Sequence, residues 1–175
     1  MNIILMGVAG SGKSTVGKLL AKKMQWQFLE GDDFHSSNNI KKMKAGIPLT
    51  DEDRIPWLQS IKNNMAPRTI VACSALKESY QKLLMDTNIS NNHFRNTNDN
   101  TLLVYLKCSP KLITKRLKQR KHFFNPSLLE SQFADLEEPA KSEQVLIVDA
   151  SLSPEEIVEK IMLDLNSYGY SLTDL

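Results

Sequence analysis

The sequence predicts an α/β protein in which a parallel five-stranded sheet lies between two layers of helices, a three-layer α/β/α sandwich. Five short apolar runs, mostly of β-branched and large aliphatic residues, are typical of buried parallel strands. Segments with the apolar spacing of helices separate these runs, and such alternation produces parallel sheets covered on both faces. The chain has 175 residues, so we expect one domain over residues 1–175.

The first strand is predicted at residues 3–6, and a glycine-rich segment connects it to a helix that begins near Thr15 and reaches Ala21. The segment reads Gly7-Val8-Ala9-Gly10-Ser11-Gly12-Lys13-Ser14. Strand, Gly-x-x-x-x-Gly-Lys-Ser and helix in this order are the context of a phosphate-binding loop. The alternative is a glycine-rich connection with an incidental Lys-Ser pair.

The chemistry of this loop predicts a bound nucleoside triphosphate. Glycines allow consecutive N–H groups to curl around an anion, and the helix N-terminus adds free donors and partial positive charge. Lys13 can reach the β- and γ-phosphates, and the Ser14 hydroxyl can ligate Mg²⁺. We expect ATP to contact Gly7, Ala9, Gly10, Ser11, Gly12, Lys13, Ser14 and Thr15.

The second strand is predicted at residues 26–29, and Asp32, Asp33 and His35 follow its end. Ser36 or Ser37 can cap a short helix that Gly46 stops. A longer helix follows and contains Pro56. If it began at Thr50, the ring would interrupt the helix, so we place the N-cap at Asp53 and the end near Met65.

The third strand is predicted at residues 69–73, with Ser74 as the cap of a helix over residues 77–85. Residues 86–100 are rich in asparagine and indicate an exposed loop. The fourth strand is expected at residues 102–106. Ser109-Pro110 opens a helix that carries Arg116 and Arg120.

A further helix is predicted to begin at Asn125-Pro126, with Leu128, Leu129, Phe133 and Leu136 facing inward, and to stop before Pro139. The fifth strand is expected at residues 145–148. Ser153-Pro154-Glu155-Glu156 is a capping box for a last helix that extends through Leu165.

Composition narrows the possible partners and the compartment. The net charge of +2 gives no support for a nucleic-acid or membrane partner, and no apolar run approaches the length of a membrane span. The apolar run at the N-terminus is too short for a signal peptide. Cys73 and Cys108 end apolar runs and are expected to be reduced core residues, which favours a cytoplasmic protein.

The carboxyl ends of parallel strands gather ligands, and acidic and basic residues follow several of the predicted strands. Asp32 is the candidate carboxylate that orients or deprotonates an acceptor hydroxyl, and a turn aspartate is its alternative. His35 can donate to a substrate hydroxyl or cap a helix. Arg54 is the candidate for holding a substrate carboxylate, against a role in surface ion pairs. Lys77 is a further candidate anion contact, although a lysine in a first helical turn is generally exposed.

Arg116 and Arg120 are four residues apart and share one helix face before the segment His122-Phe123-Phe124. This arrangement predicts a mobile lid that carries arginines over the nucleotide phosphates, with Arg120 as a catalytic cation. A basic, solvated helix face is the alternative. No aspartate follows the apolar run at residues 70–73, which favours a small-molecule kinase over a motor or switch ATPase.

Several stretches together resemble the gluconokinases, which belong to the shikimate kinase–like group of small P-loop kinases. The specific ones are Gly31-Asp32-Asp33-Phe34-His35, Asp51-Glu52-Asp53-Arg54-Ile55-Pro56-Trp57-Leu58, Cys73-Ser74-Ala75-Leu76-Lys77, His122-Phe123-Phe124 and Ser131-Gln132-Phe133 through Leu136-Glu137-Glu138-Pro139. They occur in the family's order over most of the chain. The phosphate loop alone is shared by many unrelated proteins.

The resemblance implies transfer of the γ-phosphoryl group of ATP to the 6-hydroxyl of D-gluconate, which supplies the pentose phosphate pathway. It implies an acceptor-binding segment over about residues 32–66, a lid over about residues 120–127 and a homodimer. Asp32 would activate the acceptor, His35 and Arg54 would line the gluconate pocket, and His122 would lie in the lid. Lys121 directly precedes His122, where the family usually has an intervening glycine.

Two rival functions remain open. One is a kinase of another hydroxy acid, such as shikimate, although that family differs at the acceptor segment. The other is an ATP-binding regulator with little catalysis. The combination of Lys13, Ser14, Asp32 and the paired arginines favours the enzyme.

Overall fold

The computed structural model describes residues 1–85, 101–118 and 126–167. Within them, five strands form a single parallel sheet in the order β2-β3-β1-β4-β5. The strands are β1 (Asn2–Met6), β2 (Gln27–Glu30), β3 (Thr69–Ala72), β4 (Thr101–Lys107) and β5 (Val145–Asp149). The predicted α/β fold with a parallel five-stranded sheet is therefore confirmed.

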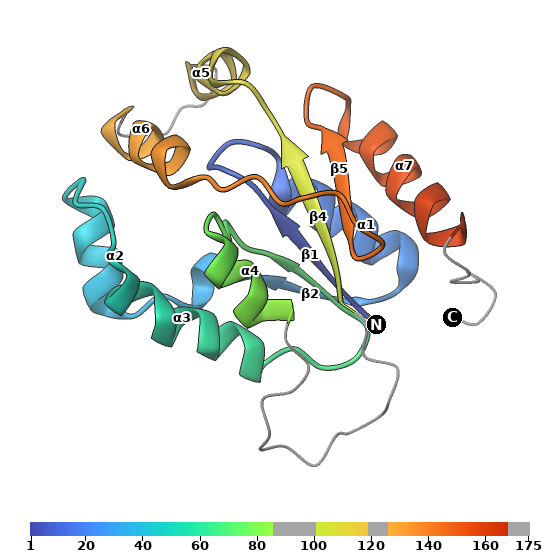
Figure 1. Cartoon of the computed structure of the whole chain (residues 1–175), viewed down its shortest axis with the longest axis horizontal. Coiled ribbons are helices and arrows are strands. Elements are labelled where there is room, and N and C mark those ends of the chain that lie inside the picture. The colour runs from blue at the N-terminus through green and yellow to red at the C-terminus, as the bar shows by residue number, and fades with distance from the viewer. Residues whose placement is uncertain (86–100, 119–125, 168–175) are drawn as a thin grey trace.

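Helices connect successive strands and cover both faces of the sheet (Figure 1). They are α1 (Lys13–Met24), α2 (Ser37–Lys44), α3 (Asp51–Asn63), α4 (Glu78–Met85), α5 (Pro110–Lys118), α6 (Pro126–Asp135) and α7 (Pro154–Ser167), with a short 3₁₀ helix, η1, at Gly31–Phe34. Among the described residues, no helix has the length and apolar content that a membrane span requires.

The alternation of side chains along β1 divides the core between the two faces. Ile3 and Leu5 point to one face and pack with residues of α1 and α7. Ile4 and Met6 point to the other and pack with residues of α3 and α4. A strand buried on both faces reads as a continuous apolar run, and this is the reason that the sequence locates β1 so directly.

The strand order places the start of α1 at the point where the topology reverses. From β1, the chain proceeds to β2 and β3 on one side and returns to β4 and β5 on the other. In open α/β sheets, ligands bind beyond the carboxyl ends of the strands at such a switch point. The glycine-rich segment between β1 and α1 lies there.

The prediction that Asp53 caps α3 is wrong. The helix begins at Asp51, its N-cap is Thr50, and Pro56 lies inside it. Asp53 is instead the partner of Thr50 in a capping box: its carboxylate accepts from the Thr50 N–H (3.0 Å), and its own N–H donates to the Thr50 hydroxyl (3.4 Å). These bonds offset the hydrogen bond that Pro56 cannot make.

The start of α4 also differs from the prediction. This helix begins at Glu78, and the N–H groups of Tyr80 and Gln81 donate to the carbonyl of Lys77, so Ser74 is not its cap. The carbonyl of Ser74 accepts instead from the N–H of Gly7 (3.2 Å) and fixes the start of the glycine-rich segment. The caps predicted for α5 and α7 at Ser109 and Ser153 are confirmed, and of the two candidates for α2, Ser36 or Ser37, the cap is Ser36.

Candidate active site

A cavity of about 890 Å³ opens at the carboxyl ends of the strands. The glycine-rich loop and the start of α1 line one part of it, and residues from η1, α2 and α3 line another. Helix α6 contributes Leu128, Ser131 and Gln132. Of the residues predicted to carry chemistry, the cavity brings together Ala9, Gly10, Gly12, Lys13, Ser14, Thr15, Asp32, His35 and Arg54.

The glycine-rich loop has the backbone conformation of an anion cradle. Gly7, Gly10 and Gly12 all have positive φ angles, and Gly12, at φ +108°, directly precedes α1. An L side chain rarely adopts that conformation, so the glycine allows the loop to turn into the helix. Ser11 is buried, and its N–H donates to the carbonyl of Val8, which closes the turn.

Lys13 is the first residue of α1 and folds back over the loop. Its Nζ donates to the carbonyls of Gly7 and Val8, at 2.9 Å each. Burial lowers the pKa of Lys13, and the charge of Asp32 acts in the opposite direction. The ammonium group is therefore held at the mouth of the loop, where it can reach phosphate oxygens.

Asp32 and His35 lie together beside the loop. Asp32 comes from η1 and is 80% exposed, whereas the His35 side chain is 4% exposed, and the two approach to 3.9 Å between Nε2 and Oδ1. The His35 ring stacks on Trp57, with centroids 4.2 Å apart. The indole N–H of Trp57 donates to the Gly31 carbonyl (2.7 Å), so α3 fixes the turn that presents Asp32.

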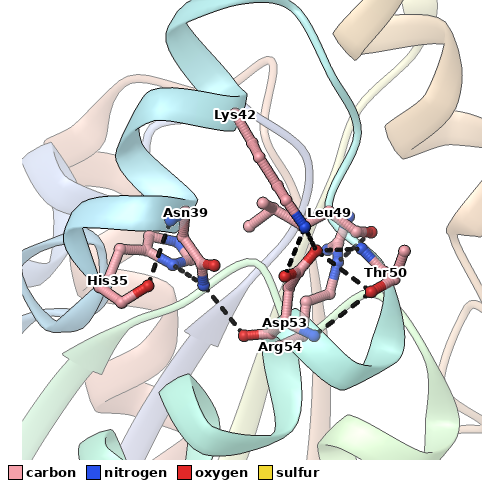
Figure 2. A network of polar contacts seen from close by, with 8 residues as sticks. His35, Asn39, Lys42, Leu49, Thr50, Asp53 and Arg54 are labelled. Atoms are coloured by element: carbon pink, nitrogen blue, oxygen red, sulfur yellow. Dashed lines mark hydrogen bonds and ion pairs between the residues drawn. The ribbon is translucent and has the colours of Figure 1, made fainter.

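Asn39 determines which nitrogen of His35 carries the proton, through a contact between the two side chains (Figure 2). Its Nδ2 donates to the carbonyl of Asp53 (2.9 Å), which can only accept, and also lies 3.4 Å from His35 Nδ1. This contact makes Nδ1 the acceptor of neutral His35 and leaves the proton on Nε2, the nitrogen facing Asp32. Burial lowers the pKa of His35, with a smaller contribution from Arg54, while Asp32 opposes the shift.

Asp53, on α3, pairs with Lys42, on α2 (Figure 2). Lys42 Nζ lies 2.7 and 2.8 Å from the two carboxylate oxygens of Asp53. The hydrogen bond from Lys42, followed by that from the Thr50 backbone, lowers the pKa of Asp53. The two helices that enclose the acceptor side of the cavity are thus fastened to each other.

Arg54 is buried but lines the cavity. Its Nε donates to the Leu49 carbonyl (3.2 Å), and a terminal nitrogen lies 3.4 Å from the Asp135 carboxylate at the end of α6. The guanidinium group also lies over the ring of Tyr80, 5.9 Å from its centroid. These contacts hold a permanent positive charge at the acceptor side of the cavity.

Among the described residues, four of the predicted site residues do not line the cavity. Two of them, Gly7 and Ser11, are buried within the loop. The other two lie elsewhere. Lys77 does not line the cavity, and its Nζ pairs with Asp51 at 2.6 Å. Arg116 does not line it either: its guanidinium donates to the carbonyls of Ser11 (3.2 Å) and Ala150 (2.6 Å). Arg116 therefore supports the phosphate loop without lining the cavity. Arg120 and His122 lie outside the described residues, as does most of the predicted lid at residues 120–127.

Sequence reasoning missed the contributions of α6 to the site. Gln132 Oε1 accepts a hydrogen bond of 2.6 Å from the N–H of Ala9, and Asp135 pairs with Arg54. In the sequence, Ser131-Gln132-Phe133 is only one of the stretches that resemble the gluconokinases. The signal that could have found Gln132 is a polar residue between the apolar positions Leu129 and Phe133 on a helix near the ligand edge of the sheet.

The donor set fits Mg²⁺ held mainly by phosphate oxygens. The described residues contain no group of three or more His, Cys, Asp or Glu side chains that could hold a metal ion. The Ser14 hydroxyl and the Asp32 carboxylate both line the cavity. Mg²⁺ commonly takes one or two oxygen ligands from the protein and completes its shell with phosphates and water.

Comparison with known proteins shows the family. The family model described as Shikimate kinase matches residues 9–166. A protein named probable gluconokinase from Dictyostelium discoideum is 43% identical over 174 residues, which cover 91% of this chain and 83% of that protein. The chain belongs to the gluconokinase family.

Two further gluconokinases are similar to this chain, and one of them has a solved structure. The thermoresistant gluconokinase of Escherichia coli K12 is 43% identical over 164 residues, covering 89% of this chain and 87% of that enzyme. The crystal structure of a gluconokinase from Sinorhizobium meliloti 1021 matches with a TM-score of 0.82 and 38% identity, over 95% of this chain and 91% of that one. The resemblance read from the sequence is thereby confirmed.

Proposed function

We propose that this member of the gluconokinase family transfers the γ-phosphoryl group of ATP to the 6-hydroxyl of D-gluconate, giving 6-phospho-D-gluconate and ADP. One observation carries the proposal: a single cavity joins the phosphate loop to a carboxylate, Asp32, and a buried cation, Arg54. A sugar acid has a hydroxyl at one end and a carboxylate at the other, so it can meet both groups at once. The product would enter the pentose phosphate pathway.

On the nucleotide side, the loop N–H groups and Lys13 would bind the phosphates of ATP, and Ser14 would be the protein ligand of Mg²⁺. When bound, the ion neutralises charge on the β- and γ-phosphate oxygens. Lys13 already points across the loop mouth, because its Nζ donates to the carbonyls of Gly7 and Val8. Arg116 supports this side indirectly by bonding the Ser11 carbonyl.

On the acceptor side, Asp32 would accept the proton of the 6-hydroxyl and orient its oxygen for in-line attack. Its exposure of 80% leaves the carboxylate free to meet a substrate. The Nε2–H of His35 would donate to a hydroxyl of the sugar acid. Arg54 would bind the substrate carboxylate, because a guanidinium forms forked pairs with carboxylates.

Further parts of the proposal rest on the length of the chain, on the spacing of its arginines and on the family resemblance. They are a single kinase domain over residues 1–175, an acceptor-binding segment over about residues 32–66, a lid over about residues 120–127 that brings Arg120 and His122 to the substrates, and a homodimer. A cytoplasmic location is supported by the free thiols of Cys73 and Cys108.

The substitution Asp32→Asn tests the catalytic assignment, with Asp33→Asn as a matched control. Both residues lie exposed in η1, but only Asp32 lines the cavity. Loss of an acid–base group typically lowers the rate about 10²–10⁴-fold, so we expect a loss of this size in gluconate-dependent kcat for Asp32→Asn. Asp33→Asn is expected to stay within a few-fold of wild type. Equal activities of the two variants would exclude the role given to Asp32.

A further inference from the structure

Two side chains of α6 contact residues from the two halves of the cavity: Gln132 lines the cavity itself, and Asp135 contacts Arg54, which lines it. Gln132 binds the N–H of Ala9 in the phosphate loop at 2.6 Å. Asp135 lies 3.4 Å from a terminal nitrogen of Arg54. Residues three apart share one face of a helix, so one face of α6 contacts the nucleotide side and the acceptor side together.

Each of these contacts occupies a group that a substrate can use. The carboxamide oxygen of Gln132 accepts a loop N–H, as an oxygen of a phosphate group does. The Asp135 carboxylate is the same chemical group as the carboxylate of a sugar acid, and it faces the arginine assigned to that carboxylate. The Leu49 carbonyl already binds Nε of Arg54, so a forked pair with a substrate carboxylate would use the two terminal nitrogens. Asp135 already accepts from one of these terminal nitrogens.

The chain directly after α6 is anchored by other contacts, so the helix would stay attached to the domain at its C-terminal end if these two contacts broke. Directly after it, the N–H of Glu137 donates to the Leu76 carbonyl (2.8 Å), and Gln81 donates to the carbonyl of Glu137 (3.0 Å). The next residue, Glu138, pairs with Lys107 at 2.6 Å. Gln132 and Asp135 are both only half-buried, so neither belongs to the packed core.

We propose that Gln132 and Asp135 are positioning residues that link the binding of the two substrates. In the structure, they hold the Ala9 N–H and Arg54. ATP displaces Gln132, and the sugar acid displaces Asp135. Since both side chains belong to one helix face, release of one weakens the contact of the other, and each substrate binds more tightly when the other is present. Such coupling is reciprocal by thermodynamic linkage. The acceptor half of this inference rests on the proposed function.

The acceptor half is tested with Asp135→Asn, and Glu130→Gln is the control because it also removes one negative charge from α6, at an exposed position. Calorimetric titration with gluconate in the absence of nucleotide measures the effect. Asp135→Asn is expected to lower the Kd about two- to tenfold, the range for the net value of one hydrogen bond. Glu130→Gln is expected to leave it unchanged. A higher Kd for Asp135→Asn would overturn the inference, because Asp135 would then help Arg54 to hold the acceptor.

The nucleotide half is tested with Gln132→Met, which keeps the length of the side chain and removes the acceptor oxygen. Titration with a non-hydrolysable ATP analogue and Mg²⁺ is expected to give a Kd about two- to tenfold lower than in wild type. The coupling between the sites is the ratio of the gluconate Kd without the analogue to the gluconate Kd with it. In the variant that combines Gln132→Met with Asp135→Asn, this factor is expected to fall to near one. An unchanged factor would overturn the link between the two sites.

The two proposals fail in different ways. Wild-type protein that binds the analogue but neither binds nor phosphorylates gluconate would contradict the proposed function. The titration of Gln132→Met with the analogue uses no gluconate, so it still decides whether Gln132 competes with the nucleotide. A weaker affinity of this variant for the analogue would overturn the inference even if gluconate turnover were normal.

Discussion

The indole N–H of Trp57 is expected to stabilise both the fold and the turn that carries Asp32. Trp57 is 3% exposed, and its Nε1 donates to the Gly31 carbonyl at 2.7 Å. In Trp57→Phe, this carbonyl is left buried without its donor, which costs about 1–3 kcal/mol. The smaller ring leaves a void that adds about 1 kcal/mol. We therefore expect the free energy of unfolding to fall by about 2–4 kcal/mol, a large part of the roughly 5–15 kcal/mol typical of a domain.

Trp26→Phe provides a matched control for this measurement. Trp26 is half-buried, and its indole nitrogen has no hydrogen-bond partner among the described residues. The same change of ring there removes no hydrogen bond, so we expect a loss of less than about 1 kcal/mol. Urea unfolding followed by far-ultraviolet circular dichroism compares the two variants without relying on tryptophan fluorescence. Equal losses in both variants would refute the importance of the Trp57–Gly31 hydrogen bond.

Three further substitutions test other parts of the structure. Burial holds the pKa of His35 below its ordinary value of 6.5, so the unfolded chain takes up a proton first and the free energy of unfolding falls as the pH drops below that value. His35→Gln should flatten this pH dependence. Equal slopes of the unfolding free energy between pH 7.5 and 5.5 in the variant and in wild type would contradict the expectation. Arg116→Met should raise the KM for ATP several-fold with a smaller effect on the KM for gluconate, because the Ser11 carbonyl loses its donor. Steady-state kinetics with an unchanged KM for ATP would contradict the role of Arg116 in supporting the phosphate loop. Ser153→Ala should lower stability by about 1 kcal/mol through the lost cap of α7, with kcat unchanged, and urea unfolding without a shift would exclude the cap as a stabilising element.

Much of the fold follows from local patterns in the sequence. The β-branched run at Thr69–Ala72 and the aliphatic run that contains β4 are buried on both faces of the sheet, so their composition alone identifies them. The caps at Ser36, Ser109 and Ser153 are local interactions between residues three apart in the chain. Such features require no knowledge of distant contacts.

The errors came from interactions between distant residues or from competing local rules. Pro56 suggested a late start of α3, but the capping box of Thr50 and Asp53, reinforced by Lys42, has the greater effect. The position of Lys77 after the third strand suggests an anion contact, whereas its Nζ pairs with Asp51. Arg54 reaches Asp135 across a separation of 81 residues, which no local pattern can reveal. The phosphate loop was predictable because strand, glycines, lysine and helix are contiguous in the chain.

The most direct test of the account is ADP release by wild-type protein with Mg-ATP and one acceptor at a time: gluconate, shikimate, glucose, glycerate or none. We expect strong stimulation by gluconate alone, because Arg54 and Asp32 lie in one cavity and suit a sugar acid with a primary hydroxyl. Stimulation by a different acid would retain the kinase and contradict the assigned acceptor. Tight binding of ATP without stimulation by any acceptor would contradict catalysis itself and favour an ATP-binding regulator.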